Sequence, residues 1–216
     1  MFRIKIALVI GGLMMAFVGV QEWRLTQVAK AEPQAISCAD LSAKGPGDNA
    51  HVKLTDFLMC EQSFVYEGKK NNPKWNNIWV PAVPVGGEYH RKVMEQVTPE
   101  GKLKGPPPIP TDIKVIVKSG KVPSEAELTQ LAAQPTLDGL VTNNVETLGS
   151  KERKILEDSY PGTDFSKCWI IDHERKPAGM GQVAGLSGGG VLLTLLGLGW
   201  FLAGRRAPAA APPAQI

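Results

Sequence analysis

The sequence predicts an α+β domain with a mixed or antiparallel sheet and short helices, flanked by an N-terminal and a C-terminal transmembrane helix. Three observations lead to this fold class. Uncharged apolar segments lie near both ends of the chain, at Ile6–Gln21 and Ala178–Gly204, and all 21 acidic residues lie between them. The stretch that they enclose alternates strand-like and helix-like patterns, as expected of one ordinary domain over residues 22–177.

The C-terminal apolar segment predicts a transmembrane helix over residues 178–204. A helix rises about 1.5 Å per residue, so the segment can cross a hydrocarbon core of roughly 30 Å. Trp200 and Phe201 precede Arg205 and Arg206, an order typical of aromatic anchoring at the interface followed by a cationic stop. The Ala/Pro-rich residues 205–216 are then expected to form a disordered cytoplasmic tail.

The N-terminal segment allows two interpretations. A cationic start, an apolar run and the sequence AKA at residues 29–31 have the order of a signal peptide with a small-residue cleavage site. The apolar run ends about ten residues before that site, which is a long spacing for cleavage. Outward snorkelling of Arg3 and Lys5 would lengthen a short span. We favour an uncleaved signal anchor over residues 1–21, and cleavage stays open.

Positive charge flanks the two apolar segments on their outer sides, with Arg3 and Lys5 before the first and Arg205 and Arg206 after the second. Lys and Arg concentrate in cytoplasmic flanks. We therefore expect a protein integral to the cell membrane, with cytoplasmic termini and an extracytoplasmic domain. The lipid bilayer is its first partner, and the near-neutral domain gives no indication of nucleic-acid binding.

Small residues recur at helical spacing in both apolar segments. Positions four apart share one helix face, so such residues make a smooth strip on which another helix can approach closely. Two alternatives stay open: the two helices of one chain pack together, or the strip binds a second copy or another membrane protein. The residues of the strip are Gly181, Gly185, Gly189, Gly197, Gly12 and Ala16.

Within the domain, apolar alternation and apolar runs predict strands over 51–57, 63–67, 76–85, 113–119, 137–143 and 168–174. Short helices are expected from Glu88, after the capping-box serine Ser124, and from Ser150. Pro81 and Pro84 cannot donate a backbone hydrogen bond, so they predict that the 76–85 strand lies at a sheet edge. The proline-rich residues 105–110 predict a stiff connector.

No catalytic, cofactor-binding or metal-binding motif is recognised, so we predict a non-enzymatic protein without a cofactor. His51, His90 and His173 are widely spaced and lack the HxxxH spacing that brings two metal ligands to one face. Asp172, His173 and Glu174 are adjacent in a predicted strand, where neighbours point to opposite faces and do not form an acid–base pair.

Three cysteines lie in the segment predicted to leave the cytoplasm, where disulfides can form. Their odd number leaves one pair with a free thiol or no pair at all. The pair would join Cys38 and Cys60. The alternative for Cys60 and Cys168 is a buried free thiol that packs as a small apolar side chain.

Trp75 and Trp79 lie among asparagines, a combination that is compatible with a sugar- or peptide-binding face. Such a face would make the domain a cell-envelope ligand-binding module. We favour the alternative, a turn whose two indoles fold onto the core.

The sequence VIVKSGKVP, Val115–Pro123, together with two end helices around one domain, resembles the Surf-one family of cytochrome oxidase assembly proteins. The family's motif after the first helix is not reproduced by residues 19–27, so the resemblance assigns no site residue. It implies a haem-copper oxidase as partner. Our leading interpretation is a two-pass membrane protein whose domain makes protein contacts in a scaffold or assembly role.

Overall fold

The computed structural model describes residues 2–61, 64–68, 74–111, 113–143 and 148–203. The chain forms two compact units. One combines Met1–Thr26 with Ala178–Ile216, and the other spans Gln27–Pro177. Expectations for residues 205–216, including the cationic stop and the disordered tail, lie outside the described residues.

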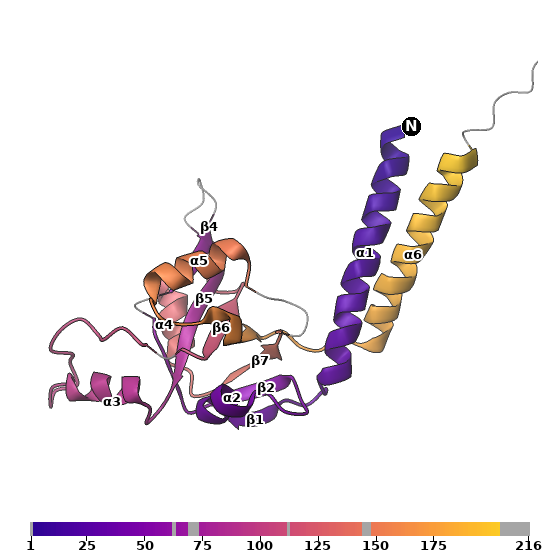
Figure 1. Cartoon of the computed structure of the whole chain (residues 1–216). Helices are drawn as coiled ribbons and strands as arrows, with labels where there is room; N and C mark the ends of the chain where they lie inside the picture. The colour runs from indigo at the N-terminus through magenta and orange to yellow at the C-terminus, as the bar shows by residue number, and fades with distance from the viewer. Residues whose placement is uncertain (1, 62–63, 69–73, 112, 144–147, 204–216) are drawn as a thin grey trace, which may run out of the picture. The chain divides into compact units, whose positions relative to one another are not determined.

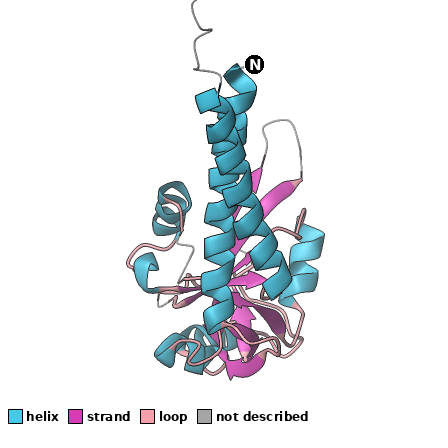
Figure 2. Cartoon of the chain, turned by 90° about the vertical axis from the view of Figure 1, so that its right-hand side faces the viewer, coloured by secondary structure: helices cyan, strands magenta, loops and turns pink. Residues whose placement is uncertain are grey.

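Two long apolar helices, α1 (Phe2–Val28) and α6 (Met180–Ala203), make up the described part of the first unit. Both are long and apolar enough to cross a membrane, over Arg3–Val28 and Met180–Leu202. They run side by side and antiparallel, so the start of α1 and the end of α6 lie at the same end of the pair (Figures 1 and 2). The first apolar run is thus part of a 27-residue helix that extends beyond the uncharged residues Ile6–Gln21 at both ends.

The second unit is built on a mixed sheet, which confirms the α+β class. The strand order is β1-β2-β7-β8-β6-β5-β3, and β4 also pairs with β5. The β1/β2 and β6/β8 pairs are parallel and the others antiparallel. The strands are β1 (Gln34–Ser37), β2 (His51–Thr55), β3 (Phe57–Met59), β4 (Val65–Gly68), β5 (Trp75–Pro84), β6 (Val115–Ser119), β7 (Leu137–Val141) and β8 (Trp169–His173).

The sheet closes on itself through one bent strand. Only Asp56 separates β2 from β3, yet β2 pairs with β7 and β3 pairs with β5. Asp56 has a left-handed backbone with φ of 52°, and its carbonyl accepts a hydrogen bond from the Val85 N–H at 2.9 Å. The two ends of the β2-β7-β8-β6-β5-β3 path therefore meet at this corner, as in a barrel.

Apolar side chains on the two faces of the sheet form two separate cores. Val115 and Val117 of β6 belong to one core and Ile116, between them, to the other, because successive side chains point to opposite faces. The first core includes residues of α2 (Cys38–Lys44) and α4 (Glu125–Ala132). The second includes residues of α5 (Ser150–Ser159) and the 3₁₀ turn η1 (Phe165–Lys167).

Strands occur in all six predicted places, and helices begin at Glu88, Glu125 and Ser150. The Ser124 hydroxyl bonds to the Glu127 carboxylate and not to a first-turn N–H, so the predicted capping box is not formed. The N-cap of α5 is Gly149, and Ser150 is its first helical residue. Residue 63 of the second predicted strand lies outside the described residues. The helix from Glu88, α3 (Glu88–Glu95), buries none of its residues, although a packed apolar face was expected. Four elements among the described residues were not predicted as such, namely β1, α2, β3 and η1.

The assignment of β5 to a sheet edge is wrong. The strand pairs with β6 on one side and with β4 and β3 on the other. The Pro81 carbonyl accepts from the Cys60 N–H at 2.9 Å. In an antiparallel strand the nitrogen and the carbonyl of one residue point to the same side. The Pro81 nitrogen, which has no hydrogen to donate, therefore points to this same side of β5, where neither β4 nor β3 has a register partner for Pro81. Pro84 ends the strand. Neither proline thus removes a bond that the ladder needs.

Candidate functional site

Small residues line the contact between α1 and α6. A Cβ added at Gly12 would lie 2.5 Å from Oγ1 of Thr194, and one at Gly190 would lie 2.4 Å from the Ala16 nitrogen. A Cβ at Gly197 would lie 2.7 Å from the nearest methyl carbon of Val9. These backbones approach each other so closely that no larger residue fits without a shift. Of the predicted strip, Gly12, Ala16 and Gly197 lie in this contact.

The remaining predicted positions are outside it or at its margin. Nothing lies within 4 Å of a Cβ built at Gly181 or Gly185, and Gly189 meets only the Met15 methyl carbon, at 3.0 Å. The contact on α6 instead uses small residues three and four apart, a spacing that keeps one face toward an antiparallel partner. They are Ser187, Gly190, Thr194 and Gly197. Gly181 and Gly185 therefore do not lie in the α1–α6 contact, and their contact with a second copy or another membrane protein stays a prediction.

Trp75 and Trp79 do not share a face. The β4/β5 register shifts between Glu67 and Gly68, so Gly68 lies opposite Trp75 while Glu67 lies opposite Asn77. This bulge turns Trp75 toward the first core, and Trp79, only 7% exposed, belongs to the second. The predicted joint binding face of Trp75 and Trp79 is therefore not formed.

An aromatic cluster does form around Trp75, with partners that the sequence analysis did not select. The Trp75 ring stacks on Tyr66 with centroids 5.1 Å apart and meets Phe64 at 5.0 Å. Tyr66 is 55% exposed. Residues 69–73, which include two of the asparagines, lie outside the described residues. The cluster gives the β4/β5 end an exposed aromatic surface.

All three cysteines are buried free thiols. The predicted disulfide between Cys38 and Cys60 is not formed in this structure and stays a prediction. Burial raises the pKa of both thiols to about 12, so neither is a reactive thiolate near neutral pH. The Cys168 thiol donates to the Ile113 carbonyl, with sulfur and oxygen 3.2 Å apart. Their chemistry is that of apolar packing groups.

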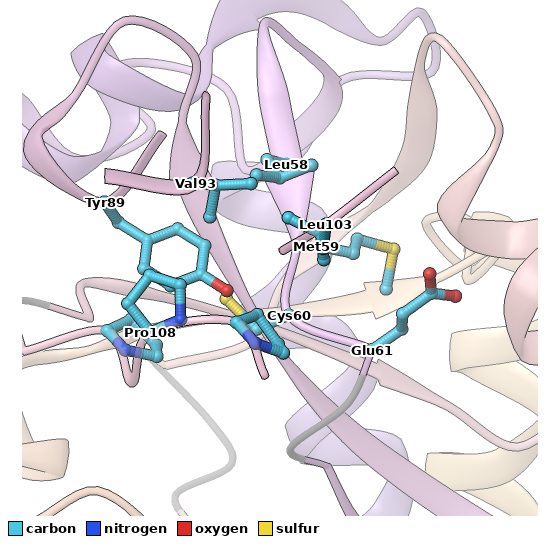
Figure 3. Close-up of a pocket in the computed structure, with 10 residues that line it drawn as sticks. Leu58, Met59, Cys60, Glu61, Tyr89, Val93, Leu103 and Pro108 are labelled. Carbon is cyan, nitrogen blue, oxygen red and sulfur yellow. The ribbon is translucent and has the colours of Figure 1, made fainter. Parts of the chain in front are cut away.

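A pocket of about 150 Å³ lies beside Cys60 and Tyr89, between the end of β3, α3 and the proline-rich residues 107–110. The Tyr89 hydroxyl points to the Cys60 sulfur and hydrogen bonds to it (Figure 3). Burial raises the pKa of Tyr89 above its ordinary value. Apolar residues otherwise line the pocket, with Glu61 at its rim. Of the lining side chains, Cys60 is held as a protonated thiol by burial, and Glu61 is the one carboxylate.

The polar residues near β8 are held in separate local pairs. Nδ1 of His173 donates to the Asp138 carbonyl at 3.2 Å, and burial lowers the pKa of His173. Asp172 pairs with Arg175 at 3.2 Å, and Glu174 pairs with Lys121. Among the described residues, no group of three His, Cys, Asp or Glu side chains could hold a metal ion. Glu174 Oε1 also lies 3.9 Å from Nε2 of His173, so the expectation that these neighbours point to opposite faces is wrong for this pair. Glu174 follows the end of β8 and has a left-handed backbone with φ of 58°, so strand alternation does not apply to it.

Comparison with known proteins gives no match: no family model, no curated protein and no solved structure is similar to the chain. The Surf-one resemblance of residues 115–123 therefore stays a prediction. The structure places these residues in β6 and in the turn that leads to α4.

Proposed function

We propose that this chain is a two-pass integral membrane protein whose central domain lies on the extracytoplasmic side and makes protein contacts in a scaffold or assembly role. The observation that carries the proposal is the pair of long apolar helices joined through small residues, with the whole folded domain inserted between them. Outer flanks that carry only positive charge support cytoplasmic termini.

The described side chains support a contact role better than a catalytic one. Ionisable residues near β8 are paired locally, the thiols are protonated, and apolar side chains remain exposed on α3 and on the loop that follows it. Met94 is 55% and Ile109 60% exposed. Exposed apolar groups of this kind serve binding more readily than bond-breaking chemistry.

Cysteine labelling tests the sidedness. The native thiols are buried, so the wild-type chain gives a low background with a membrane-impermeant maleimide. We expect Ala43→Cys, at an exposed position on α2, to be labelled in intact cells. Ala209→Cys, in the tail, should be labelled only after permeabilisation. The reverse pattern would refute the proposed sidedness.

Photo-crosslinking tests the contact role. A photoreactive residue placed at Met94 or Tyr66, both exposed, should yield adducts of defined mass in intact membranes. The same residue at buried Leu156 should yield none. A failure of both exposed positions to form any protein adduct would count against the contact role while leaving the sidedness result intact.

A further inference from the structure

The residues that follow α1 are built into the core of the domain. Ala29 is only 9% exposed and belongs to the first core, and Val28 packs against it. The Val28 carbonyl accepts a hydrogen bond of 2.7 Å from the Ala50 N–H, and the Ala50 carbonyl accepts one of 2.8 Å from the Val141 N–H. The end of α1 is thereby linked to the start of β2 and, through it, to β7.

Asn49 holds this segment with its side chain. Its Oδ1 accepts from the Lys30 N–H at 2.8 Å and from the His51 N–H at 3.0 Å, and its Nδ2 donates to the Glu32 carbonyl at 2.9 Å. Asn49 is 3% exposed, so these bonds replace water that the side chain has lost.

His51 completes the arrangement, which we call the Asn49–His51 clamp. Its Nδ1 donates to the Lys30 carbonyl at 3.0 Å, and the residue is 4% exposed. Both backbone groups of Lys30 are therefore bonded to buried side chains of the domain. Gln34 adds a bond of 3.0 Å from its Nε2 to the Asn49 carbonyl.

The clamped residues overlap the small-residue sequence AKA at 29–31, which resembles a signal-peptide cleavage site. Cleavage after Ala31 would take Ala29 out of the core and would remove both bonding partners that Lys30 supplies. Asn49 would keep its bonds to the His51 N–H and the Glu32 carbonyl. Nδ1 of His51, however, would lose the Lys30 carbonyl as its acceptor in a residue that is 4% exposed, and a buried polar atom without a partner is costly. The segment is thus a structural part of the domain and is not a removable leader.

We propose that α1 stays attached to the domain in the mature protein, because the Asn49–His51 clamp makes residues 28–32 part of the folded core. The inference rests on the proposed function, since it concerns the first of the two membrane helices. It adds that residues 28–32 are hydrogen-bonded into the domain.

Epitope tags at both ends of the full chain test retention directly. Immunoblots of the membrane fraction should show one species that carries both tags. A shorter species with the C-terminal tag alone, which Ala31→Leu converts back to the longer one, would overturn the proposal. This result does not depend on the side of the membrane, which the labelling of Ala43→Cys reports separately.

Limited trypsin digestion of the full chain in detergent tests the clamp. Asn49→Ala removes the side-chain bonds to Lys30 and Glu32, and we expect cleavage after Lys30 to become at least about tenfold faster. Asp48→Ala, at the exposed neighbouring position, is the matched control and should leave that rate unchanged.

Cleavage after Lys118 in β6 reports global unfolding in the same digest. Faster cutting at Lys30 alone would show local release of the segment, and parallel cutting at both sites would show that the whole domain needs the clamp. Either supports the proposal. An unchanged Lys30 rate in Asn49→Ala would overturn it.

Discussion

Nζ of Lys5 donates a hydrogen bond of 2.8 Å to the main-chain carbonyl of Trp200, and it lies 5.5 Å from the centroid of the Trp200 ring. The two residues belong to the first turns of α1 and the last turns of α6. A lysine near a helix C-terminus meets carbonyls that lack partners within the helix. The pair therefore joins the two antiparallel helices at their shared end.

The small-residue contact predicts that two glycines on α6 respond differently to the same change. Gly190→Leu should separate α1 from α6, because a Cβ at this position would lie 2.4 Å from the Ala16 nitrogen. A disulfide engineered between Lys5→Cys and Trp200→Cys measures the contact in membranes. We expect its yield to fall severalfold in the Gly190→Leu background.

Gly185→Leu is the matched control, since nothing lies within 4 Å of a Cβ built at Gly185. The engineered disulfide should form as in the parent. If this variant instead lowers oligomer yield after cross-linking, Gly185 contacts a second molecule, as the sequence strip predicted. Equal loss of the disulfide in both variants would contradict the register described above.

Periodicity predicted the elements of the domain because it reports local burial. The β6 run, for example, is apolar at Val115, Ile116 and Val117, and all three are fully buried. The same run could not predict two cores, since a strand covered on both faces carries no alternation. Periodicity could not predict the closure of the sheet at Asp56 either, because the closure depends on pairings between strands that are distant in sequence.

The site predictions failed where a single residue changes the register. The bulge at Asn76 moves Trp75 to the other face of the sheet, and a spacing of four in the sequence does not reveal it. The helix contact at Gly190 was missed for a similar reason, since Gly188, Gly189 and Gly190 are identical in type. Only the partner helix distinguishes them.

The sheet corner predicts a sharp contrast at Asp56. The backbone φ of 52° at this position disfavours residues branched at Cβ. The Asp56 side chain is exposed, so a substitution there changes no core packing. Asp56→Val should lower the free energy of unfolding by about 1–2 kcal/mol, and Asp56→Gly should be nearly neutral. Thermal denaturation in detergent measures both.

Lys53→Val places the same side chain in β2, where the backbone is extended, and should cost less than Asp56→Val. The ion pair of Lys53 with Asp138, at 3.8 Å, is exposed and therefore weak. Equal losses at positions 53 and 56 would show that the corner carries no conformational restriction.

The buried thiols predict that the domain loses stability at alkaline pH. Burial raises the pKa of Cys38 and of Cys60 in the folded state to about 12, against 9.0 for a solvent-exposed thiol. Below pH 9 both states are protonated and the thiols contribute their full stabilisation. Between these pH values the unfolded chain releases protons that the folded chain retains, so the free energy of unfolding falls by up to about 1.4 kcal/mol per pH unit per thiol.

Melting temperatures of the full chain between pH 8 and about 11 measure this effect. Cys60→Ala should flatten the alkaline decline relative to wild type, although the truncation itself lowers the melting temperature at every pH because it leaves a small cavity. The slope of the melting temperature against pH therefore tests the prediction, and the melting temperature at any single pH does not. An equally steep decline in wild type, Cys60→Ala and Cys38→Ala would show that other groups cause it. If Cys38 and Cys60 form a disulfide under oxidising conditions, the part of the alkaline decline that the two thiols cause should disappear. It should return after the disulfide is reduced.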